Sequence, residues 1–203
     1  MTGTSAELTA FAAEALKRVR EQAPLVQCLT NTVVANFTAN ALLAVGADPA
    51  MVDIPGEAGP FAGVASGVLI NVGTLPAGQS NAMMQAALAA GTAGTPWVLD
   101  PVGIGSLPVR TALAQQLLGL QPTVIRGNAS EIVALAGLSG GRRGMDAIQR
   151  VDRPYEAASA LATRYGGVVA VSGPVDLVVD PAGSVEVANG DPMLTRVLSL
   201  IHI

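Results

Sequence analysis

The chain has 203 residues, half of them hydrophobic and 3% aromatic, with a formal net charge of −4 at pH 7. This length predicts one domain with a sizeable core, and the acidic balance argues against nucleic acid as a partner. No apolar run reaches the roughly 20 residues of a membrane span, no secretory leader opens the chain, and the single Cys28 excludes an intrachain disulfide, so a cytoplasmic protein is predicted. The surplus of small apolar residues predicts a homo-oligomer that buries part of the surface.

Helical and extended patterns alternate along most of the sequence. A helix is predicted over residues 5–21, opened by a Thr4–Glu7 capping box, and a second over 33–45, closed by Gly46. Strands follow at 50–52 and 68–72, the second after a helical stretch. The later predicted elements are helices near 79–90, 109–118 and 155–164, a helix that begins after residue 127, strands at 97–99, 123–125 and 168–171, a loop over 139–153, and a hairpin of strands 176–180 and 184–188.

Strands that alternate with helices predict an α/β fold with a mostly parallel sheet and helices on both faces. The late hairpin adds antiparallel strands at one edge. No linker or internal repeat divides the chain, which favours one domain. The sequence has neither the Walker-type phosphate loop nor the glycine fingerprint of dinucleotide-binding dehydrogenases, so both classes are disfavoured.

Polar and glycine residues stand at the ends of several predicted strands. Because the carboxyl ends of parallel strands meet at one edge of a sheet, these residues are expected to converge in a binding site. They are Met51, Asn71–Thr74, Asp100–Gly103, Arg126–Asn128 and Ser172–Gly173.

Two charged residues of this set and Glu131, three residues after Asn128, are the main candidates for phosphate and metal chemistry. Arg126 directly follows a buried strand, and its planar guanidinium suits phosphate. Glu131 either closes a capping box with Asn128 or holds Mg²⁺ through water. Asp100 is either a turn-forming residue before Pro101 or an acid that faces the same metal and phosphates.

The remaining candidates also have two interpretations. Ser172 and Gly173 offer a hydroxyl or backbone N–H groups to phosphate. Met51 is more typical of a core position than of a binding site, and Cys28 is most simply a small buried hydrophobic residue.

Several runs together resemble the hydroxyethylthiazole kinase family, collinearly from about residue 15 to residue 197. The resemblance implies a ribokinase-like fold, usually a homotrimer with sites at its subunit interfaces. It also implies ATP- and Mg²⁺-dependent phosphorylation of the hydroxyethyl group of 4-methyl-5-(2-hydroxyethyl)thiazole in thiamine salvage. The runs are Pro24–Val26, Thr30–Asn31, Asn36–Ala44, Asn71–Leu75, Asp100–Gly103 and Arg126–Glu131.

The resemblance also assigns roles to single residues. Met51 matches the methionine that contacts the thiazole, and Asn31 lies near the substrate in the family. Arg126 and Ser172 match ATP contacts, whereas Asp100 and Glu131 match acids near Mg²⁺ and the phosphates. One departure concerns the pocket: Gln27-Cys28 stands where many members have His-Asn or His-Ser.

A second departure lies at the end of the chain. After Val197 the family continues with a Thr-Gly-x-Gly-Cys turn that holds the transferred phosphate, whereas this sequence continues as Leu198–Ile203. We therefore predict an incomplete domain over 1–197, a non-family tail over 198–203 that arises from a sequencing artefact or a frameshift, and missing C-terminal helices. No catalytic residue is assigned, His202 has no role, and little or no turnover is expected.

Two alternatives to the thiazole kinase stay open at this point. One is a non-catalytic thiazole-binding or oligomerising protein derived from the kinase, which binds ligand without consuming ATP. The other is a ribokinase-like kinase of another small alcohol, such as a pyridoxine-type substrate.

Overall fold

The computed structural model describes residues 4–138 and 153–193, which form two compact units. Unit 1 runs to Ile70 and includes Pro76–Trp97, and unit 2 consists of Asn71–Leu75 and the described residues from Val98 onward. The loop predicted at 139–153, except for its last residue, lies outside the described residues. So does the predicted tail at 198–203, with His202.

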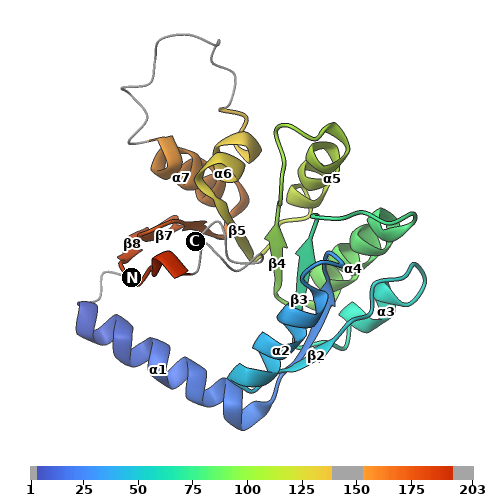
Figure 1. Cartoon of the computed structure of the whole chain (residues 1–203), viewed down its shortest axis with the longest axis horizontal. Coiled ribbons are helices and arrows are strands. Elements are labelled where there is room, and N and C mark those ends of the chain that lie inside the picture. The colour runs from blue at the N-terminus through green and yellow to red at the C-terminus, as the bar shows by residue number, and fades with distance from the viewer. Residues whose placement is uncertain (1–3, 139–152, 194–203) are drawn as a thin grey trace. The chain divides into compact units, whose positions relative to one another are not determined.

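Unit 1 holds three parallel strands in the order β2-β1-β3, so their carboxyl ends lie at one edge. Its buried side chains include Leu29, Ile70, Met83 and Trp97. Helix α3 packs beside α4 (Figure 1). The elements are α1 (Ser5–Gln22), β1 (Leu25–Leu29), α2 (Ala35–Val45), β2 (Asp48–Ala50), α3 (Ala58–Ala62), β3 (Gly67–Asn71, with Asn71 in unit 2) and α4 (Gln79–Ala93).

Unit 2 combines parallel and antiparallel strands. The strands β4, β5 and β6 are parallel, and β6, β7 and β8 are antiparallel. Helix α7 packs against α6 and against β6 and β7 (Figure 1). The elements are β4 (Trp97–Asp100, with Trp97 in unit 1), α5 (Pro108–Leu118), β5 (Val124–Asn128), α6 (Ala129–Leu135), α7 (Arg153–Tyr165), β6 (Val168–Ser172), β7 (Asp176–Asp180) and β8 (Gly183–Val187).

The predicted α/β class, the late hairpin and the first helix cap are confirmed. The Thr4 N–H donates to Glu7 Oε2 at 2.7 Å and the Glu7 N–H donates to Thr4 Oγ1 at 3.4 Å. These hydrogen bonds, the one from the Thr4 backbone above all, hold the pKa of Glu7 below its ordinary value. Among the described helices, none is long and apolar enough to cross a membrane.

Two predicted strands differ from the observed ones by two or more residues at a boundary, and one strand was not predicted. The strand placed at 50–52 ends at Ala50, because Asp48–Ala50 is the stretch that pairs with Leu25–Gln27. The strand placed at 123–125 continues to Asn128, since its pairing with β6 extends that far, so Arg126 lies inside this strand and does not follow it as predicted. Strand β1 was missed because the polar Gln27 interrupts its apolar pattern.

Gly46 ends α2 with a φ of +98°, and this position gives a stability prediction for unit 1. A Cβ at Gly46 would lie 2.8 Å from Arg20 Cγ and 2.9 Å from Arg20 Cα, so the backbone of α1 itself blocks any side chain. We expect Gly46→Ala to lower the free energy of unfolding by about 2 kcal/mol, from left-handed strain and overpacking together. The fluorescence of the single, buried Trp97 in a urea titration reports this transition.

Gly94→Ala is the matched control for this substitution. Gly94 ends α4 with a φ of +73°, and a Cβ there would meet no atom within 4 Å. The loss of unfolding free energy in Gly94→Ala therefore measures the backbone strain alone. Equal losses from the two substitutions would show that contact with Arg20 contributes nothing.

Candidate active site

Three parallel strands of unit 2 end on polar side chains. Asp100 is the last residue of β4, Asn128 of β5 and Ser172 of β6. Asn128 lies opposite Ser172 in the register of β5 and β6. The predicted convergence of these groups at one edge of the strands is therefore observed within this unit.

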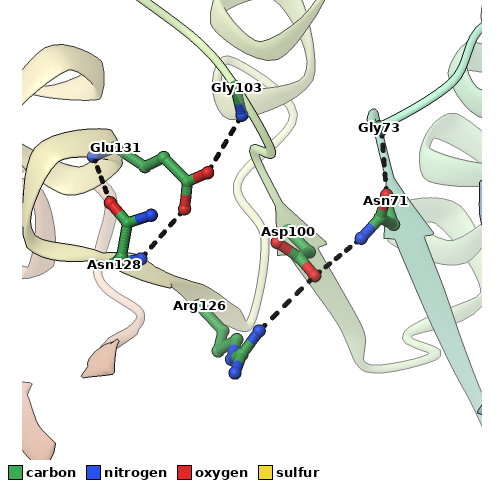
Figure 2. A network of polar contacts seen from close by, with 7 residues as sticks. All are labelled: Asn71, Gly73, Asp100, Gly103, Arg126, Asn128 and Glu131. Carbon is green, nitrogen blue, oxygen red and sulfur yellow. Dashed lines mark hydrogen bonds and ion pairs between the residues drawn. The ribbon is translucent and has the colours of Figure 1, made fainter. Parts of the chain in front are cut away.

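Asp100 is the centre of a polar cluster at this edge (Figure 2). Asn71 Nδ2 donates to Asp100 Oδ2 at 2.7 Å, and Asn71 Oδ1 accepts from the Gly73 N–H at 2.9 Å. Because one end of the amide must donate and the other must accept, its orientation is fixed. Asn71 therefore holds the Asp100 carboxylate in place. A residue that only formed the turn before Pro101 would not need its carboxylate oriented in this way.

Arg126 is the cationic member of the same cluster. Its Nη1 lies 3.8 Å from Asp100 Oδ2, which is an ion pair but longer than a hydrogen bond. The side chains of Arg126 and Asp100 are 33% and 14% exposed. The guanidinium is thus partly desolvated beside one carboxylate while its N–H donors remain able to bind a further anion.

Glu131 joins two segments through its carboxylate (Figure 2). Its Oε2 accepts from the Asn128 N–H at 2.9 Å, and Asn128 Oδ1 accepts from the Glu131 N–H at 2.9 Å, so the predicted capping box is confirmed. Its Oε1 accepts from the Gly103 N–H at 2.9 Å. The start of α6 and the loop after β4 are therefore linked by one buried side chain.

Gly103 has a reason to be glycine in that loop. Its φ is +72°, and a Cβ would lie 3.1 Å from Arg110 Nη1 and 3.3 Å from Leu107 Cδ1. A side chain would be strained in this conformation and would crowd both neighbours. The loop conformation that presents the Gly103 N–H to Glu131 depends on this residue.

Ser172 and Gly173 differ in what they can offer a ligand. Ser172 is half-buried at the carboxyl end of β6. The Gly173 N–H donates to Asp176 Oδ1 at 2.9 Å, so this backbone donor is already engaged within the protein. The hydroxyl of Ser172 is the group that stays a candidate.

The two residues matched to the alcohol substrate lie in unit 1, each just past a parallel strand. Met51 follows β2 and is 40% exposed, so its interpretation as a core residue is wrong. Asn31 follows β1 by two residues and is 9% exposed. Asn31 Oδ1 accepts from the Val34 N–H at 3.1 Å and so shapes the turn into α2.

Two buried glutamines beside these residues were not predicted as site residues from the sequence. Gln27 Nε2 donates to Val52 O at 2.8 Å and to Ala58 O at 3.0 Å. Gln79 Nε2 donates to Asp53 Oδ2 at 2.9 Å and, more weakly, to Thr30 O at 3.4 Å. Sequence patterns gave only one hint of them, the departure from the family at Gln27.

Three buried oxygen atoms of this region have no hydrogen-bond partner among the described residues. They are Gln27 Oε1, Thr30 Oγ1 and Gln79 Oε1. A buried polar atom without a partner costs about 1–3 kcal/mol. This polar network is therefore not the arrangement that stability alone would favour.

Cys28 is 1% exposed, and burial raises the pKa of its thiol to about 11. The prediction of a small buried hydrophobic residue is confirmed. Within residues 4–138 and 153–193, no group of three or more histidine, cysteine, aspartate or glutamate side chains is placed to hold a metal ion.

Comparison with known proteins identifies the family. The model of the hydroxyethylthiazole kinase family matches residues 16–200. The hydroxyethylthiazole kinase of Clavibacter sepedonicus is 58% identical over 196 residues, a match that covers 97% of this chain and 71% of the relative. The chain belongs to the hydroxyethylthiazole kinase family. The family predicted from the sequence motifs is thereby confirmed, and with it a phosphotransferase enzyme.

Solved structures agree with this assignment to the hydroxyethylthiazole kinase family. A hydroxyethylthiazole kinase from Pyrococcus horikoshii OT3 superposes with a TM-score of 0.83 at 41% identity, covering 92% of this chain and 70% of that one. A pyridoxal kinase from Bacillus subtilis, seen as an ADP complex, gives 0.55 at 16% identity, covering 83% and 76%. The second likeness shows a shared fold only, and the predicted ribokinase-like fold is confirmed.

Proposed function

We propose that the protein transfers a phosphoryl group from ATP, with Mg²⁺, to the hydroxyethyl group of 4-methyl-5-(2-hydroxyethyl)thiazole, a step of thiamine salvage. Membership of the hydroxyethylthiazole kinase family supports the reaction. The proposed site rests on one observation: the oriented Asp100 carboxylate at the end of β4 lies beside the Arg126 guanidinium from β5.

Arg126 and Ser172 are the residues proposed to bind the phosphates of ATP. The guanidinium offers several N–H donors in one plane, which matches phosphate oxygens, and its partial burial strengthens each charged hydrogen bond. The half-buried Ser172 hydroxyl at the end of β6 supplies a smaller, neutral donor.

The carboxylates of unit 2 fit a magnesium ion that binds mainly through water and phosphate. Mg²⁺ is usually held by only one or two protein carboxylates, so a set of three protein ligands is not required. Asp100 fits such a role, because Asn71 orients its carboxylate and 14% of the side chain is exposed. When bound, Mg²⁺ would neutralise charge that develops on the phosphates.

Glu131 is proposed to act near the metal through water. Each of its oxygens already accepts a backbone N–H, from Asn128 and from Gly103. A carboxylate in this state retains lone pairs for a water molecule. Its role in this proposal is to hold the Gly103 loop and to orient such a water.

The alcohol is proposed to bind in unit 1 beside Met51 and Asn31. Met51 presents an exposed, polarizable thioether just past β2, which suits a sulfur-containing aromatic ring. Asn31 lies just past β1, at the same edge. No residue is assigned as general base.

We also propose a homotrimer and a single domain over 1–197. Unit 1 exposes many large apolar side chains for one monomer, which supports self-association. They are Val33, Phe37, Leu43, Val45, Ile54, Val64 and Leu88. Light scattering after size exclusion measures the mass, and a monomer at micromolar concentration would rule the trimer out. The cytoplasmic location stays a prediction.

The direct test combines binding and turnover. Calorimetry measures the affinity of the protein for ATP, with and without Mg²⁺, and for the thiazole alcohol, and mass spectrometry then detects the phosphorylated thiazole. Binding of both ligands with product formation supports the kinase. Binding of the alcohol without ATP consumption supports the non-catalytic alternative, and phosphorylation of pyridoxal in place of the thiazole supports the other kinase. The same assay tests the prediction of little or no turnover by residues 1–203.

Asp100→Asn tests the metal assignment within this experiment. The substitution keeps the side-chain shape and removes the charge, so it should abolish the gain in ATP affinity that Mg²⁺ provides. Asp180→Asn is the matched control, since Asp180 accepts the N–H groups of Ala182 and Gly183 in the hairpin turn, and asparagine can accept them equally.

A further inference from the structure

We propose that Gln27 and Gln79 are positioning residues for the alcohol, which hold the segment 51–58 and the turn after β1 in their binding conformations. This inference rests on the proposed function in one respect, the assignment of Met51 and Asn31 to the alcohol. The hydrogen bonds themselves lie wholly within unit 1.

Gln27 holds both ends of the segment that carries Met51. One amide nitrogen donates to Val52 O and to Ala58 O, at 2.8 and 3.0 Å. Rotating the amide by half a turn would place its oxygen against two carbonyl oxygens, so the observed orientation is the one that bonds. Because Gln27 lies in the middle of β1 and is fully buried, the segment is anchored to a rigid strand.

Gln79 links this segment to the second alcohol residue. Its Nε2 donates to the Asp53 carboxylate and to the carbonyl of Thr30, the residue before Asn31. Both partners are acceptors, so the orientation of this amide is also fixed. A single side chain at the start of α4 therefore links the Asp53 side chain, two residues after Met51, to the backbone of Thr30, one residue before Asn31.

The same two amides leave an oxygen each without a partner, which points away from a purely stabilising role. Gln27 Oε1 and Gln79 Oε1 are buried and accept no hydrogen bond among the described residues. A methionine has the same length, fills the same space and leaves no such oxygen. Unlike methionine, the glutamines provide Nε2 amide donors that are fixed in position.

The test replaces each glutamine by methionine in the full chain. Hydrogen exchange followed by mass spectrometry measures the amides of residues 51–58, and calorimetry measures the affinity for 4-methyl-5-(2-hydroxyethyl)thiazole and for ATP. We expect Gln27→Met and Gln79→Met to accelerate exchange in this segment at least tenfold and to weaken alcohol binding about fivefold to tenfold. ATP affinity should stay unchanged, and Trp97 fluorescence should show that unit 1 is folded.

Two further variants complete the design. Gln22→Met makes the same change at an exposed position of unit 1 and should alter neither readout. Gln27→His keeps one ring N–H donor and should recover part of the alcohol affinity. If Gln27→Met fails to fold, Gln79→Met and Gln27→His carry the test.

The outcomes separate this inference from the proposed function. Unchanged exchange and alcohol affinity in folded methionine variants would overturn the inference and leave the function standing. A wild-type chain that binds no alcohol would overturn the function, whereas faster exchange in the variants would still establish the positioning of the segment.

Discussion

Arg126→Ala is expected to weaken ATP binding roughly 10- to 150-fold, because charged hydrogen bonds are worth about 1.5–3 kcal/mol. The effect is large because the guanidinium, which comes from the middle of β5, lies beside Asp100 and is partly shielded from water. Lysine cannot replace it fully, since an ammonium group lacks the planar arrangement of donors. Titration calorimetry with ATP at low and high salt measures the loss for the alanine and the lysine variants.

Arg164→Ala is the matched control for Arg126→Ala. Arg164 belongs to the same unit but lies on α7, with its guanidinium 5.3 Å from the ring centre of Tyr165. Its removal should leave ATP affinity within twofold of wild type. Equal losses of ATP affinity in the two variants would mean that only the overall charge of the protein matters for ATP binding. The proposal that Arg126 binds the phosphates would then be overturned.

Glu131→Ala is expected to lower the free energy of unfolding of unit 2 by about 3 kcal/mol, from a lost helix cap together with unpartnered N–H groups. The substitution removes the acceptors of both Asn128 and Gly103. The chain has only two tyrosines, Tyr155 and Tyr165, and both lie on α7, so tyrosine absorbance in urea follows this unit.

Two further variants, Glu131→Gln and Glu186→Ala, show how much of the lost unfolding free energy comes from the buried carboxylate. Glutamine keeps one accepting oxygen, so a loss intermediate between wild type and alanine is expected. Glu186 is exposed on β8, and its removal should cost less than about 0.5 kcal/mol, as surface changes usually do. A Glu131→Ala protein as stable as wild type would show that the link to Gly103 does not matter for folding.

The sequence predicted the parts of the site that depend on local spacing. Asn128 and Glu131 stand three residues apart, so their capping box follows from local helix geometry and was predictable. Asp100 and Arg126 are adjacent because β4 and β5 pair in parallel with Leu99 opposite Ile125. Their proximity was expected, but Arg126 was placed after its strand, whereas it lies in the middle of β5. Asn71 was recognised as a strand-end residue, but its hydrogen bond to Asp100 required the register of the strands.

The contacts that sequence reasoning missed are those between distant segments. Gln27 meets Val52 and Ala58 across 25 and 31 positions, and no local pattern encodes such a pairing. A glutamine inside an apolar run also weakens the strand signal, which is why β1 was not predicted. The exposure of Met51 was missed for a related reason, because methionine is usually buried and only the early end of β2 places it outside the core.

The burial of Cys28 has a practical consequence for spectroscopy. As the only thiol of the chain, held in the core with a raised pKa, it exists almost entirely as the unreactive protonated form at neutral pH. Maleimide reagents are therefore expected to leave Cys28 unlabelled in the folded protein. Cysteines introduced at exposed positions such as Leu88 in unit 1 and Val109 in unit 2 would carry fluorophores or spin labels alone, so distances between the units can be measured without first removing a native cysteine.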